Sequence, residues 1–289
     1  MADAHSRNDR LHGLDALRGF ALLLGLVLHA SLAYFRTPVW LVAEEGAPVA
    51  AVLFFGIHVF RMTAFFIVAG LFAHMLLATR GWMGFVKNRA SRIAGPLLGL
   101  WSLVFALFIT ALLWKVAIDN GGTLPKEGPP QPPLTVYNFP LLHLWFLWVL
   151  LILYVGTLLL RAPFAMLDRN GGWGRLIDRL TGAVVGPWTP IVLGAPLAIA
   201  LWSTPDWIPF FGIPTPDTGL IPNVIAMTGF ATAFLFGFLL DRRRDLLKRI
   251  EGLWAVFLVM GLGTTAGALV MAGGPVPVME PIDDPVARA

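Results

Sequence analysis

Long apolar segments separated by short polar connections dominate the chain. A helix needs about 20 mostly apolar residues to cross a bilayer. Seven stretches meet that requirement, namely residues 14–35, 50–78, 93–118, 139–160, 182–203, 220–240 and 253–272. Pro187, Pro190 and Pro196 interrupt the fifth stretch, and a broken span is tolerated where neighbouring helices satisfy the freed carbonyl groups. The pattern predicts an all-α, polytopic integral membrane helix bundle of about seven transmembrane helices.

Composition supports this fold class and removes most soluble alternatives. Apolar residues make up 57% of the chain and charged residues 13%, with a mean hydropathy of +0.75, whereas soluble domains carry about 25% charge. A soluble nucleic-acid binder, a disordered chain and a secreted mini-protein are therefore excluded. The net charge of +4 is typical of basic loops that flank a membrane. The chain has no cysteine, which excludes disulfides, thiolate metal sites and a cysteine-bound acyl intermediate.

Basic residues concentrate in alternate connections. Of the 21 Lys and Arg residues, 15 fall in segments on the side of the N-terminus and 4 fall on the opposite side. This asymmetry places the N-terminus in the cytoplasm. We expect one transmembrane domain over residues 1–272 and a short extracytoplasmic tail at 273–289. The proline-rich residues 119–138 are expected outside, as a stiff extended loop that is either a spacer or a lid.

Ionisable residues within the predicted spans are costly and are functional candidates for that reason. They are Asp15, Arg18, His29, His58, Arg61, His74 and His143. Arg18 and His29 are 11 residues apart, which at 100° per residue places both on one helix face about 16 Å apart. Asp15 can pair with Arg18, and Gly25, one turn before His29, leaves room beside the imidazole. The face predicts a polar passage.

Three of the histidines are expected at one depth. His29, His58 and His143 each lie a few residues from the predicted outer end of a different span, and Arg61 lies one turn beyond His58. We expect these four residues to share the outer third of the membrane. His74, near the cytoplasmic end, is expected to be interfacial without a catalytic role. A packing role remains open for each histidine, and no metal site is predicted because no carboxylate lies at that depth.

A second constellation lies in the predicted cytoplasmic loop at 79–92. It contains Arg80, Lys87, Arg89 and Arg92. Clustered cations beside a helix start suit a polyphosphate, but the same charges also satisfy the positive-inside rule or contact anionic lipids. The chain carries no Walker loop, dinucleotide fingerprint or nucleophile elbow, so ATP-driven transport and serine-hydrolase chemistry have no support.

Four motifs follow one another along the first half of the chain. Residues 14–19 read LDALRG with His29 ten residues further on, residues 60–70 read FRMTAFFIVAG, residues 89–93 read RASRI with Pro96 behind them, and residues 143–147 read HLWFL. In this order and topology they resemble the acyltransferase-3 family of membrane acyltransferases. The second motif resembles the glucans biosynthesis protein C branch, in which His58 and Arg61 also match. The resemblance is firm over residues 10–160 and only topological over 161–272.

The resemblance implies an acyltransferase-like domain at residues 1–272 in the bacterial inner (cytoplasmic) membrane. Its reaction would move an acyl group, succinyl in that branch, from cytoplasmic acyl-CoA (succinyl-CoA or acetyl-CoA) to a hydroxyl of a periplasmic glucan. No tightly bound cofactor and no nucleic acid are expected. The family usually has about ten spans, so its C-terminal third is expected to be missing here, and Ala69 stands where Ser is usual. An O-acetyltransferase for lipopolysaccharide or another envelope glycan, and a carrier or flippase, remain alternatives.

Roles can be assigned on this basis. His29 would act as general base, and Arg61 would stabilise an anion or the oxyanion. His58 and His143 would orient groups or relay protons. Arg18 would guide the arm of the acyl-CoA donor. Lys87, Arg89 and Arg92 would hold the phosphates of the donor. Direct transfer and a route through an acyl-histidine both remain possible.

Overall fold

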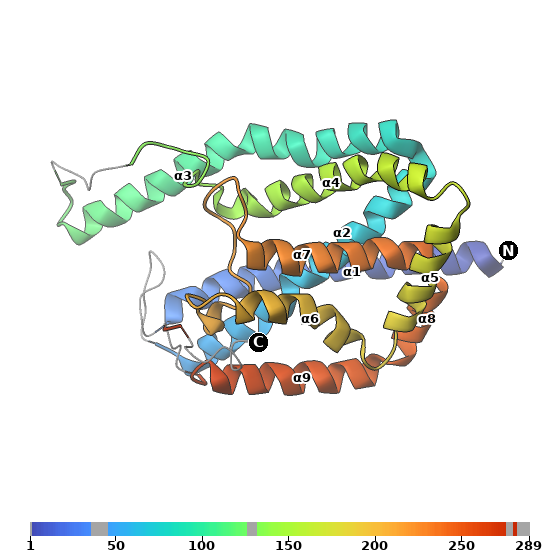
Figure 1. The fold of residues 1–289 in the computed structure, drawn as a ribbon. Coiled ribbons are helices and arrows are strands. Elements are labelled where there is room, and N and C mark those ends of the chain that lie inside the picture. Colours follow the sequence, from blue (N-terminus) through green and yellow to red (C-terminus); the bar gives the residue numbers. More distant parts are fainter. Residues whose placement is uncertain (1, 36–45, 126–131, 276–279, 282–289) are drawn as a thin grey trace. The chain divides into compact units, whose positions relative to one another are not determined.

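The structure is a computed structural model that describes residues 2–35, 46–125, 132–275 and 280–281. The side chains of residues 2–12, 14, 15 and 18 lie outside that description. Within it, the chain is almost entirely helical (Figure 1). The long helices are α1 (Ala2–Ser31), α2 (Pro48–Arg89), α3 (Gly95–Asp119), α4 (Trp145–Leu167), α5 (Gly172–Val184), α6 (Thr189–Trp202), α7 (Val224–Arg242), α8 (Asp245–Gly252) and α9 (Trp254–Met271). The predicted all-α fold class is confirmed.

Short helical turns join some of these elements. Three are 3₁₀ turns, η1 (Leu32–Tyr34), η3 (Leu142–Leu144) and η4 (Pro209–Phe211), and one is a π turn, η2 (Ala90–Ala94). The described residues contain a single isolated β-bridge, between Pro140 and Thr218.

The predicted count of seven spans is not confirmed. By length and composition, four described helical segments can cross a bilayer, or five if α5 and α6 form one bent span. The predicted second and third spans lie in one helical run, Pro48–Asp119, and the first is described as an apolar helix only over Gly19–Tyr34. α5 and α6 meet at 104°, with Pro187 in the break. The chain is therefore a multi-pass membrane protein with an interrupted fifth segment.

Gly81 divides the long helical run. Its backbone has φ 66° and ψ −178°, a combination that is essentially restricted to glycine. The π turn η2 follows and leads directly into α3. The two apolar stretches recognised in the sequence are thus separated by a glycine break and a π turn, without an irregular loop between them.

The described chain forms two compact units. The first contains α1, α5, α6, α8 and α9, with α2 up to Met75 and α7 from Thr228 onward. The second contains the rest of α2, then α3 and α4, and residues 214–227. The prediction of one domain over residues 1–272 stays a prediction, and most of the predicted tail at 273–289 lies outside the described residues.

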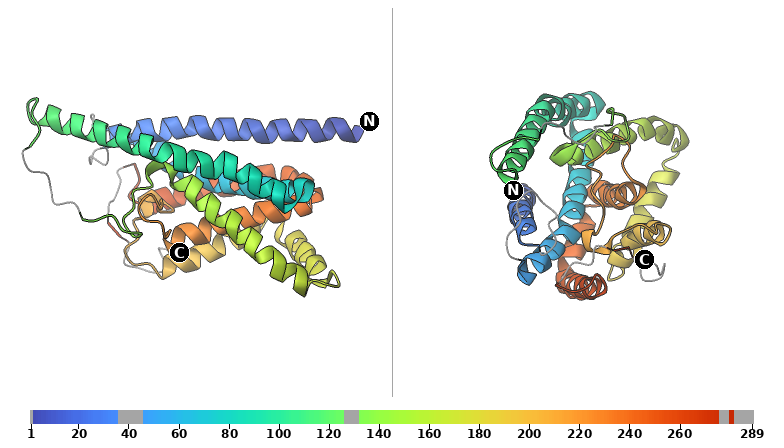
Figure 2. Two further views of the ribbon diagram at one scale, coloured as in Figure 1. Left: turned by 90° about the horizontal axis from the view of Figure 1, so that it is seen from above. Right: turned by 90° about the vertical axis from the view of Figure 1, so that its left-hand side faces the viewer.

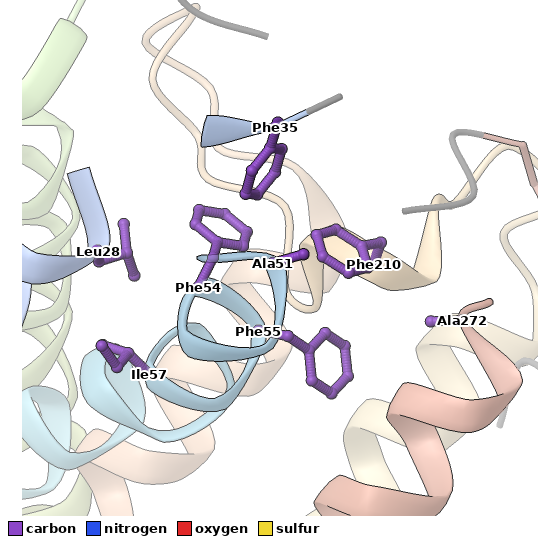
Figure 3. Packing of buried hydrophobic residues seen from close by; sticks show 8 residues of the cluster. All are labelled: Leu28, Phe35, Ala51, Phe54, Phe55, Ile57, Phe210 and Ala272. Atoms are coloured by element: carbon purple, nitrogen blue, oxygen red, sulfur yellow. The ribbon is translucent and has the colours of Figure 1, made fainter. Parts of the chain in front are cut away.

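Aromatic side chains fill the core at one end of the first unit (Figure 3). The cluster comprises Leu28, Phe35, Ala51, Phe54, Phe55, Ile57, Phe210 and Ala272. The ring centroids of Phe35 and Phe54 are 5.2 Å apart at 84°, an edge-to-face arrangement, and each buried phenylalanine contributes a large apolar area. The cluster joins the C-terminal end of the continuous helix α1 (Figure 2) to the start of α2, so these helices run antiparallel.

Two glycines bring α2 and α7 into backbone contact. A Cβ added to Gly70 would lie 2.8 Å from the carbonyl carbon of Phe234, and one added to Gly237 would lie 2.7 Å from that of Ile67. Real Cβ atoms do not approach other atoms so closely. Beside the crossing, the rings of Phe66 and Phe230 stack with centroids 4.5 Å apart. Small residues of this kind let membrane helices pack closely.

Candidate active site

The site begins where Arg61 of α2 meets Gly25 of α1. Gly25 is buried, and a Cβ built on it would clash with Nη1 of Arg61 and lie 3.5 Å from its Cζ. The guanidinium therefore lies against the backbone of α1, in space that any side chain at position 25 would occupy. The sequence predicted room beside Gly25, and the structure places Arg61 in it.

His29 and His58 lie on the same side of this contact. His29 follows Gly25 by four residues and His58 precedes Arg61 by three. Because α1 and α2 run antiparallel, the two histidines lie about 6 Å and about 4.5 Å along their helices from the contact, in the same direction. His29 is exposed at the margin of the packed face of α1. The structure thus brings His29, His58 and Arg61 into one region of the first unit.

His58 is held by the turn η4 and by Phe54. Its imidazole stacks on the Phe54 ring with centroids 5.2 Å apart and 16° between planes. The backbone groups of Phe211 and Ile213 approach the imidazole. Gly212 has φ 57° and ψ −131°, and its carbonyl accepts a 2.6 Å hydrogen bond from Nε1 of Trp207. The sequence reasoning missed this cover, although Pro209 and Gly212 signal a turn.

Two buried atoms of the site lack partners among the described residues. They are Nδ1 of His58 and Nε of Arg61, neither of which makes a hydrogen bond there. The two residues are three apart on α2 and therefore share a helix face. Leaving such a group unsatisfied costs about 1–3 kcal/mol. Nε of Arg61 always donates, whereas Nδ1 of His58 donates or accepts according to the protonation of its ring, so the site is suited to a polar ligand that accepts from Arg61.

Arg18 lies in α1 as predicted, on a helix that is continuous from Ala2 to Ser31. Its side chain and that of Asp15 lie outside the described residues. The continuous helix keeps Arg18 and His29 in the predicted angular register. The ion pair of Arg18 with Asp15 and the role of Arg18 in guiding the donor remain predictions.

His143 belongs to the second unit. It lies in η3, the turn that opens the apolar helical segment Leu142–Leu167, so it stays near the start of the predicted fourth span. Leu142 before it has φ 48°, uncommon for a residue with a side chain. The amides of Leu141 and Leu142 donate to the Asp217 carbonyl at 2.8 and 3.1 Å. These bonds hold the turn, and the Asp217 carboxylate interacts electrostatically with His143.

The cations predicted to be cytoplasmic separate into two environments. Lys87 and Arg92 are exposed, and Arg92 lies in the π turn η2. Arg89 instead places its guanidinium carbon 4.6 Å from the ring centroid of Tyr154 and 5.4 Å from that of Phe85. This cation–π stacking joins α2 to α4. Lys87 and Arg92 are thus presented for an anion, whereas Arg89 also packs the second unit.

His74 lies away from the cluster, in an ion pair with α7. Its Nδ1 donates to Oδ2 of Asp241 at 2.8 Å, and Arg244 also pairs with Asp241 at 2.7 Å. The Asp241 side chain is 3% exposed. Sequence reasoning expected no catalytic role for His74 and did not identify its partner, which lies 167 residues further on.

Comparison with known proteins decides the family. A family model described as an acyltransferase domain, acyltransferase-3, matches residues 11–285. This chain belongs to the acyltransferase-3 family. The family predicted from the four motifs is confirmed, and the chain carries an acyltransferase domain.

Curated relatives support the branch as well. Proteins named Glucans biosynthesis protein C from Salmonella schwarzengrund, Salmonella typhi and Salmonella typhimurium are each 34% identical to this chain over 147 residues. The match covers 50% of this chain and 37% of each relative. The chain therefore covers little more than a third of the length of these relatives. No solved structure matches the chain.

The acyltransferase-3 motifs include residues that pack helices together. The first lies in α1 and the second runs along α2, where Arg61 contacts Gly25 and Gly70 crosses α7. The third leads through η2 and the fourth begins at η3. Part of the motif pattern therefore reflects close helix packing around the candidate active site.

Proposed function

We propose that this protein transfers an acyl group, succinyl, from cytoplasmic acyl-CoA to a hydroxyl of a periplasmic glucan, in the inner membrane of a bacterium. The observation that carries the proposal is the meeting of His29 with His58 and Arg61, whose buried Nδ1 and Nε lack partners among the described residues. The names of the curated relatives support a glucan as acceptor.

The proposed reaction needs one base and one cationic group. The acceptor hydroxyl oxygen attacks the thioester carbonyl carbon, a carbon–oxygen bond forms, and the carbon–sulfur bond breaks. His29 takes the hydroxyl proton and delivers it to the departing thiolate, so the products are a glucan ester and free coenzyme A. His58 and His143 orient the hydroxyl or relay the proton. A route through an acyl-histidine at His29 gives the same net reaction.

The donor is proposed to approach from the cytoplasmic side. Lys87 and Arg92 are exposed there, and charged hydrogen bonds to phosphate are among the stronger contacts that proteins make. Arg89 supports this pair from its stacked position on Tyr154, and Arg18 guides the donor arm toward His29. Coenzyme A is then a substrate that leaves after each transfer, without a tightly bound cofactor.

Mass spectrometry of envelope glycans tests the proposal. Cells that express the intact chain should gain succinyl groups on periplasmic glucans, and cells that express His29→Ala should not, at equal protein level in the membrane. Lys115→Ala, at an exposed residue paired with Asp119, serves as the matched control and should behave as the intact chain. Acetyl groups on lipopolysaccharide would instead identify the O-acetyltransferase alternative. Absence of acyl-CoA turnover would favour a carrier.

A further inference from the structure

Arg61 is a half-buried cation without a counter-ion in the described part of the chain. Its guanidinium stays charged under all ordinary conditions. The Nε is buried without a hydrogen-bond partner among the described residues, and the carboxylates of the ion pairs found there are paired with other side chains. Isolated charges are expensive inside an apolar environment. An anion supplied by a ligand would remove that cost.

His58 provides a second unsatisfied atom on the same helix face. Stacking on Phe54 fixes the plane of its imidazole, and its Nδ1 is buried without a partner among the described residues. The backbone of Phe211 and Ile213 approaches the other side of the ring, so Nδ1 donates a hydrogen bond to a carboxylate in the imidazolium form, in which both ring nitrogens carry a proton. Arg61 and His58 together present donors one helical turn apart, and a carboxylate with two oxygens can accept from both.

Gly25 places this pair next to the proposed base. Because no side chain projects at position 25, the guanidinium lies on the backbone of α1, one turn from His29. A ligand carboxylate held by Arg61 would therefore sit within the same region as the reacting carbonyl. Only an acyl group with an anion at its far end can use both places.

We infer that Arg61 and His58 form a carboxylate-binding site that selects donors whose acyl chain ends in a carboxylate. This inference rests on the proposed acyl transfer and adds the residues that determine its donor specificity. A succinyl group fits because a short methylene chain separates its carboxylate from the thioester carbonyl. An acetyl group has no carboxylate and leaves Arg61 unpaired.

The competing assignment places Arg61 at the oxyanion of the reacting carbonyl. That negative charge exists only while the carbonyl is tetrahedral, so it leaves the half-buried guanidinium without an anion for the rest of the cycle. A carboxylate on the donor pairs with Arg61 from binding until release. The two assignments differ in which donors respond when Arg61 is changed.

The two assignments of Arg61 can be separated by measuring which acyl-CoA donor the full chain prefers in membranes. Transfer is measured from succinyl-CoA and from butyryl-CoA, which has a similar chain length and no carboxylate. The intact chain should prefer succinyl-CoA, and Arg61→Gln should reduce that preference roughly 10- to 100-fold, the range expected for a lost charged hydrogen bond. Arg61→Lys should retain part of it, because an ammonium pairs with a carboxylate without the bidentate geometry.

Glycine variants provide a test that leaves the charge intact. Gly25→Ala should also reduce the preference, because the new Cβ displaces the guanidinium. Gly56→Ala on α2 is the matched control, since a Cβ there meets no atom within 4 Å, and it should keep the preference of the intact chain. Equal losses with both donors in Arg61→Gln would overturn the inference and assign Arg61 to the oxyanion.

Binding without transfer distinguishes failure of this inference from failure of the proposed function. The detergent-purified chain should be stabilised more against heat by succinyl-CoA than by butyryl-CoA, because at equal concentration the ligand that binds more tightly raises the stability more. Arg61→Gln should remove the difference. A difference in binding with no transfer from either donor would reject the proposed reaction and retain the site. Equal stabilisation of the intact chain by both donors would reject the site.

Discussion

His74 on α2 and Asp241 on α7 form an ion pair, with 2.8 Å between Nδ1 and Oδ2. The histidine ring also meets the edge of Phe238, with centroids 4.8 Å apart. Arg244 completes the arrangement by pairing with the other oxygen of Asp241. His74, for which the sequence predicted no catalytic role, thus joins two helices.

Asp241→Asn should destabilise the protein. The buried carboxylate accepts from both His74 and Arg244, and its loss should cost about 1–3 kcal/mol. Thermal unfolding of the detergent-purified chain measures this. Asp245→Asn is the control, because its pair with Arg243 is exposed and exposed pairs contribute little. Equal unfolding temperatures for the two variants would contradict a role of Asp241 in packing.

Gly70→Ala should disrupt the crossing of α2 and α7. Its Cβ would meet the backbone of Phe234 and of Phe238, whose amide nitrogen would be only 2.9 Å away. Overpacking of this kind typically costs about 1–3 kcal/mol, and here backbone must move. The amount of folded protein in the membrane and its unfolding temperature should both fall. Gly56→Ala, with open space around it, should leave both measurements unchanged.

His29→Ala should lower acyl transfer by roughly two to four orders of magnitude, the usual contribution of a general base. Its exposure at the margin of α1 predicts that the unfolding temperature changes little. Steady-state transfer from succinyl-CoA, measured at matched protein level, provides the comparison. Near-normal transfer would remove His29 from the reaction and leave it a packing residue.

Arg89 and Arg92 should respond differently to substitution. Arg92→Gln should raise the half-saturating acyl-CoA concentration with little loss of stability, because Arg92 is exposed. Arg89→Lys should mainly lower the unfolding temperature, because an ammonium stacks less well on Tyr154 than a guanidinium does. Donor titration and thermal unfolding of both variants separate the effects. An unchanged donor dependence in Arg92→Gln would assign that residue to membrane topology.

Cysteine labelling should establish the orientation, since the chain has no cysteine of its own. Gly81 is a poor position because its positive φ would strain a cysteine. The neighbouring Trp82 and the distant Thr123 are both exposed. An impermeant thiol reagent applied to intact cells should label Thr123→Cys and leave Trp82→Cys unlabelled. The reverse labelling pattern would show that the chain has the opposite orientation in the membrane.

The fold class could be predicted because hydropathy alone distinguishes membrane helices from other elements. The shared face of Arg18 and His29 also follows from sequence, since α1 is one continuous helix. The number of spans could not be predicted in the same way. Helical structure continues from Pro48 to Asp119 with a break only at Gly81, where the sequence favours two helices joined by a charged loop.

The site was predicted where it depends on position along one helix and missed where it depends on packing between distant segments. Counting residues from the predicted outer ends of the spans placed His29, His58 and Arg61 at one depth. The stacking of Arg89 on Tyr154 and the cover of His58 by Gly212 join residues far apart in sequence. Nothing in a single sequence identifies such partners, because each depends on the final packing of helices.

The crossing at Gly70 and Gly237 restricts how the active site can open. Backbone contact there and the His74–Asp241 pair one turn further hold α2 and α7 at two levels. Helices joined in this way move as one rigid body. Among the described residues, α1 meets α2 at the aromatic cluster and at the contact of Gly25 with the flexible side chain of Arg61, without a crossing of two backbones like that at Gly70. Motion that admits substrate between His29 and Arg61 should therefore be a tilt of α1 about that cluster, with α2 and α7 as the stationary frame.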